Sequence, residues 1–313
     1  MIEMNDFTLE LIKRSGGVTS PDVQKLLLAR SKKSKLVSHQ YIVRMMNDLA
    51  RNDFYRDIIK KHVPNKSILE VGAGAGLLSL LALKYGARLV NTCEHNELLY
   101  EPLDGLFART LSNDQRLVLH KKSVFDLKKS NFRTKVDVLL HELFADDVFS
   151  EDFLLSVLFA KLFLKDTGRV VPGIVNVIAR PVFAEGLKRE PTIKPYDGFK
   201  FNELNETISR PRKYFWSKNM KIKSSEDAKV IFSLDLNKSK IPLEGQCGLR
   251  LPRKSRANVV LVYFELKDGQ NRLCTGPDGQ STHWQTTFYV IDEKSKYIRF
   301  HYKLNSFWAT FDS

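Results

Sequence analysis

Apolar and polar residues follow two different periods along the 313-residue chain. Between about residues 66 and 166, short β-branched runs alternate with segments of helical periodicity. The short runs predict buried strands at 67–71, 89–93, 117–120 and 136–141. The intervening segments predict helices at 77–85 and 98–111. Strand, helix and strand at this spacing are typical of a parallel sheet joined by right-handed crossovers.

From about residue 169 onward, the pattern changes to separated runs of alternating apolar and polar residues, which indicates antiparallel strands. These runs lie at 169–178, 229–236, 258–266, 285–291 and 297–302. Lys267-Asp-Gly-Gln270 is suited to a hairpin turn. We therefore expect an antiparallel β-barrel domain in the second half of the chain, with a sandwich as the alternative.

Two helices are predicted before the first strand. Ser20-Pro21-Asp22 has residues that commonly begin a helix. A longer helix at about 41–61 would place Met45, Leu49 and Ile59 on one side. The predicted organisation is a helical region at 1–62, an α/β domain at 63–168 and a β-barrel domain at 169–313.

The composition is that of an ordinary globular protein, with 43% hydrophobic and 27% charged residues. There is no uninterrupted apolar run of roughly 18 residues and no basic segment followed by an apolar core at the start, so we expect neither a membrane span nor a secretory signal. Cys93, Cys247 and Cys274 are too scattered for a disulfide framework or a zinc site. We expect no metal and a cytoplasmic location, with the nucleus as the alternative.

The net charge of +14 is high for such a chain. A strongly basic surface often serves a polyanionic partner such as nucleic acid. Here the basic residues are dispersed, with short clusters at 30–35, 210–213 and 253–256, and no aromatic RNA-binding signature accompanies them. We interpret the charge as a solvated surface and keep nucleic acid as an alternative partner.

The segment with the clearest chemical meaning is Glu70-Val-Gly-Ala-Gly-Ala-Gly76, at the carboxyl end of the first predicted strand. Glycines there let the backbone turn sharply and approach a ligand, at the edge where open α/β sheets bind cofactors. A dinucleotide fingerprint would need glycine at position 77, where this chain has leucine. The alternative is a glycine-rich turn that only packs a helix against a strand.

Two further elements favour a cofactor that contains a nucleoside. The second predicted strand ends in Cys93-Glu94, and the Glu94 carboxylate is suited to accept hydrogen bonds from both hydroxyls of a ribose. The third strand leads into Ser123-Val-Phe-Asp126, which is suited to hold an adenine ring. Because all three elements occur at successive strand ends, they predict a cofactor site and weigh against simple packing.

A loop rich in acids follows the fourth predicted strand. Glu142 and Glu151 lie nine residues apart in this loop, beside the expected cofactor crevice. Two carboxylates in one pocket repel each other unless a cation lies between them. A guanidinium is a suitable cation for such a pocket, because its planar group forms bidentate hydrogen bonds with carboxylates. Two unrelated surface acids are the alternative for this loop taken alone.

Three regions taken together resemble the protein arginine methyltransferase family. They are the double-glutamate loop, Met45-Met-Asn-Asp-Leu-Ala-Arg51 and Thr282-His-Trp-Gln285. The glycine spacing also resembles motif I of class I methyltransferases, and the resemblance covers about residues 40–312. It implies a Rossmann-like domain that binds S-adenosylmethionine, a following β-barrel domain, and methyl transfer to a guanidinium nitrogen of arginine.

The resemblance also implies roles for single residues. Glu142 and Glu151 would hold the substrate guanidinium beside Trp284, while His283 and Asp48 would form a proton-accepting pair. Arg51 would bind the cofactor carboxylate. The full set of implied cofactor contacts is Met45, Arg51, Glu70, Gly72, Gly74, Glu94 and Val124. Without the resemblance, Asp48 and Arg51 would be read as a helical ion pair, Met45 as core and His283–Trp284 as a buried pair.

About residues 186–219 match the stretch that forms the family's dimerisation arm, which implies a homodimer. This otherwise polar stretch carries aromatic residues that a monomer has little reason to display, namely Tyr196, Phe199, Phe201, Tyr214, Phe215 and Trp216. The chain departs from the family where a Tyr-Phe-x-x-Tyr signature is expected upstream of Met45, since only Tyr41 lies nearby. Glu142-Leu-Phe144 looks like the monomethylating, type III branch.

The predicted substrate is arginine in proteins, with free arginine or another guanidino small molecule as the alternative. Two other classes are kept as alternatives. A nucleic-acid methyltransferase would suit the charge, but the chain has no Asn/Asp-Pro-Pro-aromatic loop. A catalytically dead regulatory subunit should have lost cofactor or glutamate residues, and both sets are present.

Overall fold

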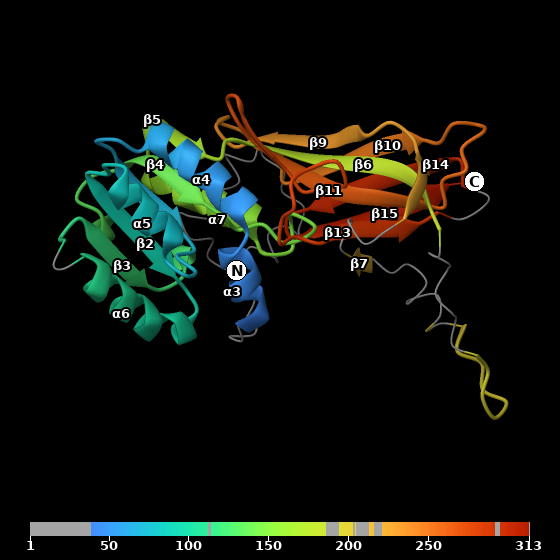
Figure 1. Ribbon diagram of the computed structural model, residues 1–313, viewed down its shortest axis with the longest axis horizontal. Helices are drawn as coiled ribbons and strands as arrows, with labels where there is room; N and C mark the ends of the chain where they lie inside the picture. Colours follow the sequence, from blue (N-terminus) through green and yellow to red (C-terminus); the bar gives the residue numbers. More distant parts are fainter. Residues whose placement is uncertain are drawn as a thin grey trace, which may run out of the picture.

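The computed structural model describes residues 39–111, 114–185, 194–202, 204, 213–215, 221–291 and 295–312. The helix start predicted at 20–22 and most of the arm predicted at 186–219 lie outside these ranges. Figure 1 shows a parallel sheet with its helices on one side of the molecule and an antiparallel assembly on the other. Within the described ranges, no helix is long and apolar enough to cross a membrane.

The first half of the chain forms the predicted parallel sheet, in the order β3-β2-β1-β4-β5. All five residues of the central strand β1 are buried, as expected for a strand covered on both faces. The four predicted strands and the two predicted helices are confirmed. Their bounds are β1 Ser67–Val71, β2 Leu89–Glu94, β3 Leu117–Lys121, β4 Val136–His141, α5 Leu77–Lys84 and α6 Tyr100–Leu111, with the short turn η1 Glu97–Leu99 before α6.

The strand order brings the predicted chemistry to one point. The chain moves outward from β1 to β2 and β3, and then returns to β4 on the other side of β1. Where the order reverses, the loops after the two central strands diverge, and ligands of open α/β sheets bind in the crevice between them. The glycine turn begins directly after β1 and Glu142 directly after β4, so both lie at this edge.

The single helix predicted at 41–61 is wrong, because it is two helices. They are α3 His39–Met46 and α4 Leu49–His62, and Asp48 caps the second by accepting a hydrogen bond from Arg51 N at 2.9 Å. Because of this break, the three residues expected on one apolar side do not share it. Met45 and Ile59 are buried, but Leu49 is 73% exposed. Asparagine and aspartate compete with helical hydrogen bonding, which is why this pair ends one helix and begins another.

A helix that the sequence pattern did not reveal, α7 Phe153–Ala160, follows the acid-rich loop. All eight of its residues are buried, so it has no polar face and no helical periodicity to detect. It packs against β4, β1 and the short turn η2 Val124–Asp126. The end of the acid-rich loop is therefore anchored in the core. Two further short turns are η3 Lys129–Asn131 and η4 Lys161–Phe163.

The strand predicted at 169–178 is also corrected, because it belongs to two strands. Residues up to Val171 end β5 Leu164–Val171, the last parallel strand, and β6 Ile174–Ala184 begins the antiparallel part. Pro172 and Gly173 separate them, with a cis peptide bond before Pro172. Proline has no N–H for a sheet hydrogen bond, so the run is interrupted there.

The predicted antiparallel β-barrel fold is confirmed. The strands form one sheet of order β7-β13-β11-β6-β8, to which β9 and β12 add, and a second of order β10-β14-β15. The turn predicted around Gly269 is confirmed, since Asp268 pairs with Asn271 across it. The strands are β7 Lys213–Phe215, β8 Ile222–Ser225, β9 Lys229–Asp235, β10 Glu244–Arg250, β11 Val259–Asp268, β12 Asn271–Cys274, β13 Thr286–Val290, β14 Tyr297–Lys303 and β15 Ser306–Asp312. The sequence pattern predicted four of these (β9, β11, β13 and β14) as strands.

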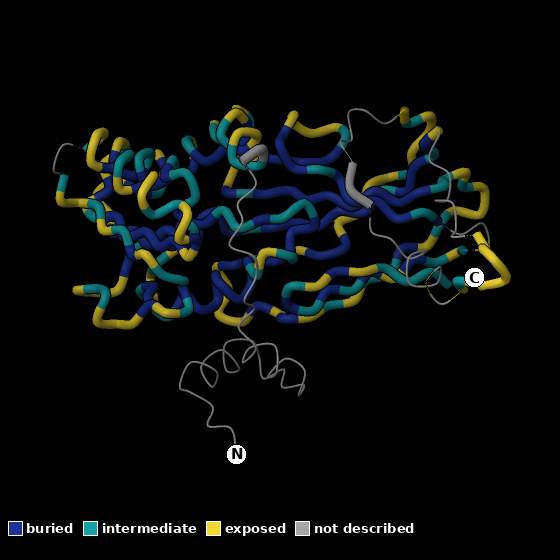
Figure 2. The backbone as a smooth tube through the Cα atoms, turned by 90° about the horizontal axis from the view of Figure 1, so that it is seen from below, coloured by how far each residue is buried: buried dark blue, intermediate teal, exposed yellow. Residues whose placement is uncertain are grey.

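One continuous core joins the two halves of the molecule. Buried residues of β1, α7, β6, β11 and β14 belong to a single apolar cluster, and Figure 2 shows buried backbone running through both sheets. In this cluster the Phe149 ring, from the acid-rich loop, stacks on Tyr302 of β14 with centroids 4.7 Å apart. The antiparallel part therefore helps to hold the loop that carries the two glutamates.

Candidate functional site

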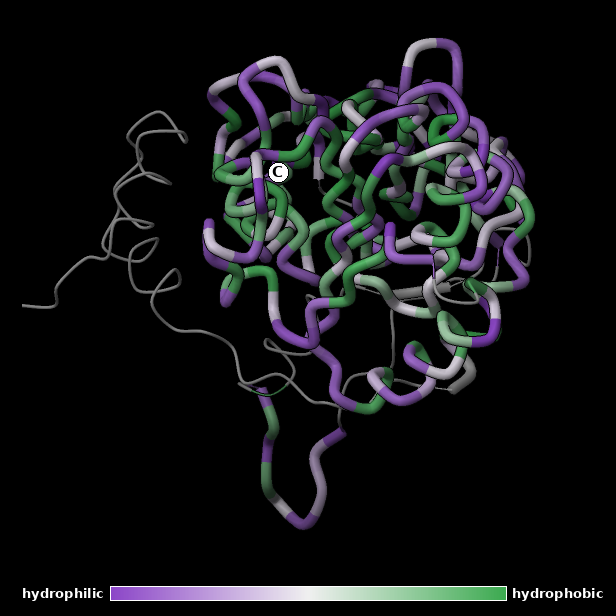
Figure 3. Tube along the Cα trace, turned by 90° about the vertical axis from the view of Figure 1, so that its left-hand side faces the viewer, coloured by the Kyte–Doolittle hydropathy of each residue, from purple (hydrophilic) through white to green (hydrophobic). Residues whose placement is uncertain are grey.

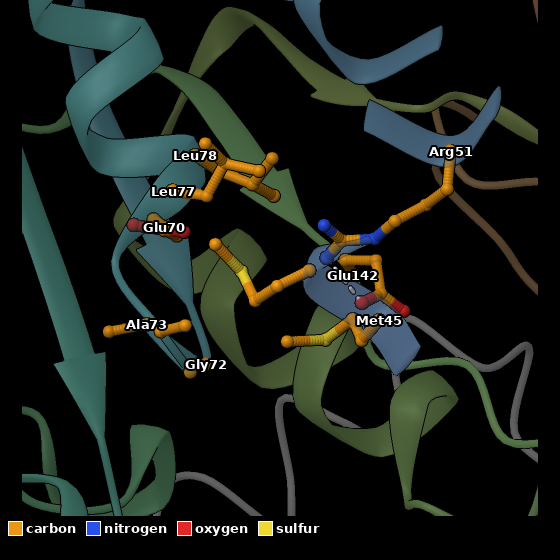
Figure 4. Close-up of a pocket in the computed structure, with 11 residues that line it drawn as sticks. Met45, Arg51, Glu70, Gly72, Ala73, Leu77, Leu78 and Glu142 are labelled. Atoms are coloured by element: carbon orange, nitrogen blue, oxygen red, sulfur yellow. Dashed lines mark hydrogen bonds and ion pairs between the residues drawn. The ribbon is translucent and has the colours of Figure 1, made fainter. Parts of the chain in front are cut away.

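A pocket lies at the sheet edge where the strand order reverses, between the glycine turn and helices α3 and α4 (Figure 4). It brings together six of the predicted site residues: Met45, Arg51, Glu70, Gly72, Gly74 and Glu142. The other described residues lining it are Met46, Ala73, Ala75, Leu77 and Leu78. Glu94 and Val124 are not part of this lining, although Glu94 contacts the glycine turn.

The glycine turn has a backbone that other residues rarely adopt. Gly72, Gly74 and Gly76 have φ angles of 80°, 54° and 80°, all in the left-handed region. A side chain at Gly72 would also collide with Leu143 of the acid-rich loop. The turn can therefore pass close to this loop and leave the pocket open before α5 begins.

Glu94 supports the glycine turn from the neighbouring strand β2. One carboxylate oxygen accepts a hydrogen bond from Gly74 N at 2.9 Å, and the other accepts one from Asn96 N at 2.8 Å. The predicted contact of Glu94 with a ribose stays a prediction. Val124 is buried in the turn η2 after β3, where it packs in the core shared with α7. Its predicted cofactor contact also stays a prediction.

Glu70 is fully buried beneath the turn. Its carboxylate accepts hydrogen bonds from Thr92 Oγ1 at 2.8 Å and from the Ser79 hydroxyl, which joins β1 to β2 and α5. Burial raises the pKa of Glu70 from 4.5 to about 7, although both hydroxyl donors oppose the shift. The acid therefore acts here as a support for the turn.

The raised pKa of Glu70 predicts a loss of stability as pH rises. The unfolded chain releases this proton near pH 4.5 and the folded protein near pH 7, so unfolding becomes more favourable between these values. A shift of this size corresponds to about 3 kcal/mol of unfolding free energy. Glu70→Gln should remove this dependence and be the more stable protein above pH 7. Urea unfolding of both proteins at pH 5 and pH 8 measures it, and equal changes in both would contradict the assignment.

Arg51 and Glu142 form a buried ion pair in the pocket. Arg51 Nη2 lies 2.7 Å from Glu142 Oε2, and the side chains are 4% and 5% exposed. Figure 4 shows the guanidinium, from α4, and the carboxylate, from the end of β4, pointing toward one another. Arg51 Nε is buried without a hydrogen-bond partner among the described residues. Glu142 therefore accepts a guanidinium in this pocket, and Arg51 has donor capacity left for an anion.

His283 and Asp48 contact each other, as predicted. Asp48 Oδ2 accepts a hydrogen bond from His283 N at 2.7 Å, and it lies 2.8 Å from His283 Nδ1. Burial acts to raise the pKa of Asp48, but the hydrogen bonds from His283 and from Arg51 N outweigh it and lower that pKa. An ionised carboxylate only accepts hydrogen bonds, so Asp48 favours a proton on His283 Nδ1. His283 Nε2 is buried and has no partner in the described part of the chain.

The segment that carries His283 is fastened to the acid-rich loop. Trp284 Nε1 donates to Phe144 O at 2.8 Å, and Gln285 N donates to Asp146 Oδ1 at 2.7 Å. Trp284 is 2% exposed and therefore acts as a brace, so its predicted contact with a substrate stays a prediction. Three segments far apart in sequence thus meet at one site.

The two glutamates of the acid-rich loop have different surroundings. The Glu142 side chain is buried, whereas Glu151 is exposed. Between them Asp147 accepts hydrogen bonds from Phe149 N at 3.0 Å and from Ser150 N at 2.9 Å, which shapes the turn before Glu151. The predicted joint action of both glutamates on one guanidinium stays a prediction.

Tyr41 was not among the predicted site residues, but the structure places it at the site. Its ring meets the His283 ring edge to face, with centroids 5.5 Å apart. Burial raises the pKa of Tyr41, and the nearby charges of Glu142, Glu151 and Asp146 raise it further, so its hydroxyl stays protonated. Its position four residues before Met45 on α3 was the available signal, because residues at that spacing share a helix face.

Comparison with known proteins finds that the chain is similar to arginine methyltransferases. No family profile matches it. It is 26% identical over 253 residues to the arginine N(omega)-methyltransferase of Streptomyces achromogenes, covering 80% of this chain and 70% of that protein. It is 24% identical over 267 residues to the probable protein arginine N-methyltransferase 1.2 of Arabidopsis thaliana, covering 79% and 70%. Human protein arginine N-methyltransferase 9 is 22% identical over 299 residues, and the chain spans 34% of its length.

Solved structures agree on the fold. A chain of the Trypanosoma brucei PRMT1 enzyme-prozyme heterotetrameric complex with AdoHcy superposes with a TM-score of 0.69 at 19% identity, covering 87% of this chain and 93% of that one. Arabidopsis thaliana protein arginine methyltransferase 10 superposes with a TM-score of 0.65 at 19% identity, covering 85% and 87%. Both share the fold of this chain, a parallel sheet with helices followed by an antiparallel β-barrel.

Proposed function

We propose that the chain is a protein arginine N-methyltransferase, which transfers the methyl group of S-adenosylmethionine to a guanidinium nitrogen of arginine. The observation that carries this proposal is the buried Glu142, which already holds one guanidinium beside the glycine turn. The Asp48–His283 pair, from two distant segments, supports it. Arginine in a protein is the first choice of substrate.

The residues of the pocket fit the cofactor. The glycine turn leaves room for a ligand beside Gly74. A Cβ at Gly74 would have Met45 Cε as its nearest neighbour, 4.0 Å away. Arg51 supplies a buried positive charge with a free Nε donor for the cofactor's carboxylate. Glu94 lies at the end of β2, where the ribose is expected. When bound, the cofactor supplies an electrophilic methyl group on a sulfonium.

The chain's own residues then position the substrate and accept its proton. A guanidinium has a pKa far above neutral, and it is a poor nucleophile while protonated. Glu142, with Glu151 as the second acid, orients the guanidinium and favours localisation of its charge away from the attacking nitrogen. With its proton held on Nδ1 by Asp48, His283 has Nε2 available to accept a proton. Holding the reacting groups together is expected to supply about 7–11 kcal/mol of the acceleration.

Free arginine is the second candidate substrate, because the Streptomyces relative is named for arginine and not for a protein.

We expect kcat/KM for an Arg/Gly-rich peptide to rise as salt is raised, because the chain's +14 charge repels a polycation and salt screens that repulsion. Free L-arginine, with one net charge, should change less. Mass spectrometry of products with both substrates across a salt series measures this and the number of methyl groups added. Faster turnover of free arginine than of every peptide would reassign the substrate, and turnover of neither would refute the proposed activity.

We also propose a homodimer held by the arm predicted at 186–219. Its described part, residues 194–202, contains a tight hairpin in which Tyr196 and Phe199 exchange backbone hydrogen bonds of 3.1 and 2.9 Å. The two side chains are 79% and 67% exposed. Figures 1 and 3 show the hairpin set apart from both sheets. Exposed aromatic residues on a projecting hairpin are typical of a surface that docks on a partner.

Replacing both Tyr196 and Phe199 by serine should therefore shift the protein from dimer to monomer at micromolar concentration. Multi-angle light scattering after size-exclusion chromatography measures the mass. Val230→Ser, which removes a 47% exposed apolar side chain from β9, is the matched control and should leave the dimer intact. A wild-type protein that is monomeric and fully active would rule out the proposed assembly.

A further inference from the structure

The three-stranded sheet β10-β14-β15 has one buried face and one face open to solvent. On the buried side, Ile298, Phe300 and Phe307 are at most 3% exposed. The alternate positions point outward, and pairing aligns them across the strands. These outward residues are Glu244, Gln246, Gly248 and Arg250 on β10, Tyr297, Arg299, His301 and Lys303 on β14, and Ser306, Trp308, Thr310 and Asp312 on β15.

Flat side chains occupy the middle of this open face. The rings of His301 and Trp308 stack with centroids 5.1 Å apart and planes 7° from parallel, and Trp308 is 41% exposed. The Arg299 guanidinium lies 5.2 Å from the Tyr297 ring centroid. Gly248 makes room for Tyr297, because a Cβ there would overlap the Tyr297 hydroxyl. The open face thus presents two pairs of stacked planar side chains, which lie outside the apolar core.

Positive charge gathers at the end of the same face. Strand β10 ends at Arg250 and leads into a loop in which Arg253, Lys254 and Arg256 are exposed. A hydrogen bond of 3.0 Å from Leu251 N to Lys296 O brings Lys296 beside this loop. Residues 250–256 and 295–299 contain six Lys or Arg and no acid, although Asp292 and Glu293 precede the second stretch in sequence.

Two cations of the face itself have acidic partners. Arg299 Nε lies 2.7 Å from Asp312 Oδ2, and Lys303 Nζ lies 3.9 Å from Glu244 Oε2. Such exposed pairs are weak and screened by salt, so they leave the guanidinium plane available for stacking. The charge that remains for a partner is therefore that of Arg250 and the basic loop.

We propose that this open face, with the basic loop beside it, binds single-stranded nucleic acid. Aromatic and guanidinium planes stack on unpaired bases of any sequence, and neighbouring cations neutralise the phosphates. An acidic peptide would use the cations but not the flat stacks, which is why nucleic acid is favoured. We interpreted the dispersed charge of +14 from sequence as a solvated surface. In this proposal, part of that charge binds phosphates on the β-barrel, away from the methyl-transfer site.

Fluorescence anisotropy of a labelled 12-nucleotide RNA with the full chain tests this proposal. Trp308→Ala should weaken binding about 5- to 100-fold, the range for loss of one stacked base. Trp308→Phe should restore most of the affinity, because it restores an aromatic face. Arg250→Gln combined with Arg253→Gln should weaken binding and make the slope of log K against log salt shallower by about 1.4, because each phosphate contact on a single strand contributes about 0.7.

The controls separate this face from general attraction to a basic protein. Lys60→Gln combined with Lys84→Gln removes two exposed charges from α4 and α5 and should leave the affinity within twofold. Bases stacked on Trp308 should also quench part of the intrinsic fluorescence, and Trp308→Phe should lose that part. The proposal would be overturned if wild type, Trp308→Ala and the Arg250→Gln/Arg253→Gln variant bound RNA with equal affinity. Tighter binding of duplex than of single strands would also overturn it. Binding of an acidic peptide but not of RNA or single-stranded DNA would assign the face to protein instead.

Discussion

Replacing Glu142 by glutamine is expected to lower turnover at least about 100-fold, the range for loss of a positioned charge at a reacting group. The amide keeps the size of the side chain but loses the negative charge that holds the Arg51 guanidinium at 2.7 Å. It would equally fail to hold a substrate guanidinium. Cofactor affinity should fall less than turnover does, because the cofactor's carboxylate is proposed to bind Arg51 and not Glu142 itself. Turnover is measured by mass spectrometry with the better of the peptide and free arginine substrates.

Two comparisons make this result specific. Glu151→Gln should show a loss of similar size if the exposed second glutamate acts on the same guanidinium. Removing one charge of a buried pair also destabilises a protein, by about 3–5 kcal/mol, so both variants are assayed at a temperature where circular dichroism shows them folded. Turnover within threefold of wild type in a folded variant would remove that glutamate from the site.

Replacing Gly74 by valine is expected to abolish binding of S-adenosylmethionine and of its demethylated product. Gly74 has a φ of 54°, a conformation that a β-branched residue adopts only with strain. Its N–H also donates to Glu94 at 2.9 Å, so a shift of the turn would displace the acid expected at the ribose. The new side chain would extend toward Met45, into the pocket. Calorimetry with S-adenosylhomocysteine measures the loss.

Gly86 provides the matched control for this substitution. It has a φ of 86° and lies just after α5, outside the pocket lining. Gly86→Val should therefore lower the melting temperature much as Gly74→Val does but leave the cofactor affinity unchanged. Unchanged affinity in a folded Gly74→Val protein would show that the cofactor binds elsewhere.

The class of fold could be predicted from sequence because it depends on local periodicity. Strands buried on both faces appear as continuous apolar runs, and β1 and β4 agree with their predicted bounds to the residue. The order of the glycine turn, Glu94 and Glu142 along successive strand ends also follows from sequence, since parallel strands bring their carboxyl ends to one edge. The chemistry expected at that edge needed only the residue types and their spacing.

Local periodicity could not predict elements whose form depends on distant partners. Helix α7 has no polar face, because residues from both halves of the molecule cover it. The break at Asp48 depends partly on His283, 235 residues away, which holds Oδ2 of the carboxylate whose Oδ1 caps α4. Strand β10, with its two glycines, forms because β14 pairs with it along its whole length.

At the site, the sequence alone determined which groups are present, and the tertiary structure decided how each is used. Glu142, Glu151, Asp48 and His283 could be named from their positions in the chain. Burial then separated the two glutamates, joined one of them to Arg51 and placed Tyr41 among the acids. Trp284 became a brace because its indole N–H found Phe144 O in the core. Such assignments depend on desolvation and on hydrogen bonds between segments up to 235 residues apart, which no short stretch of sequence encodes.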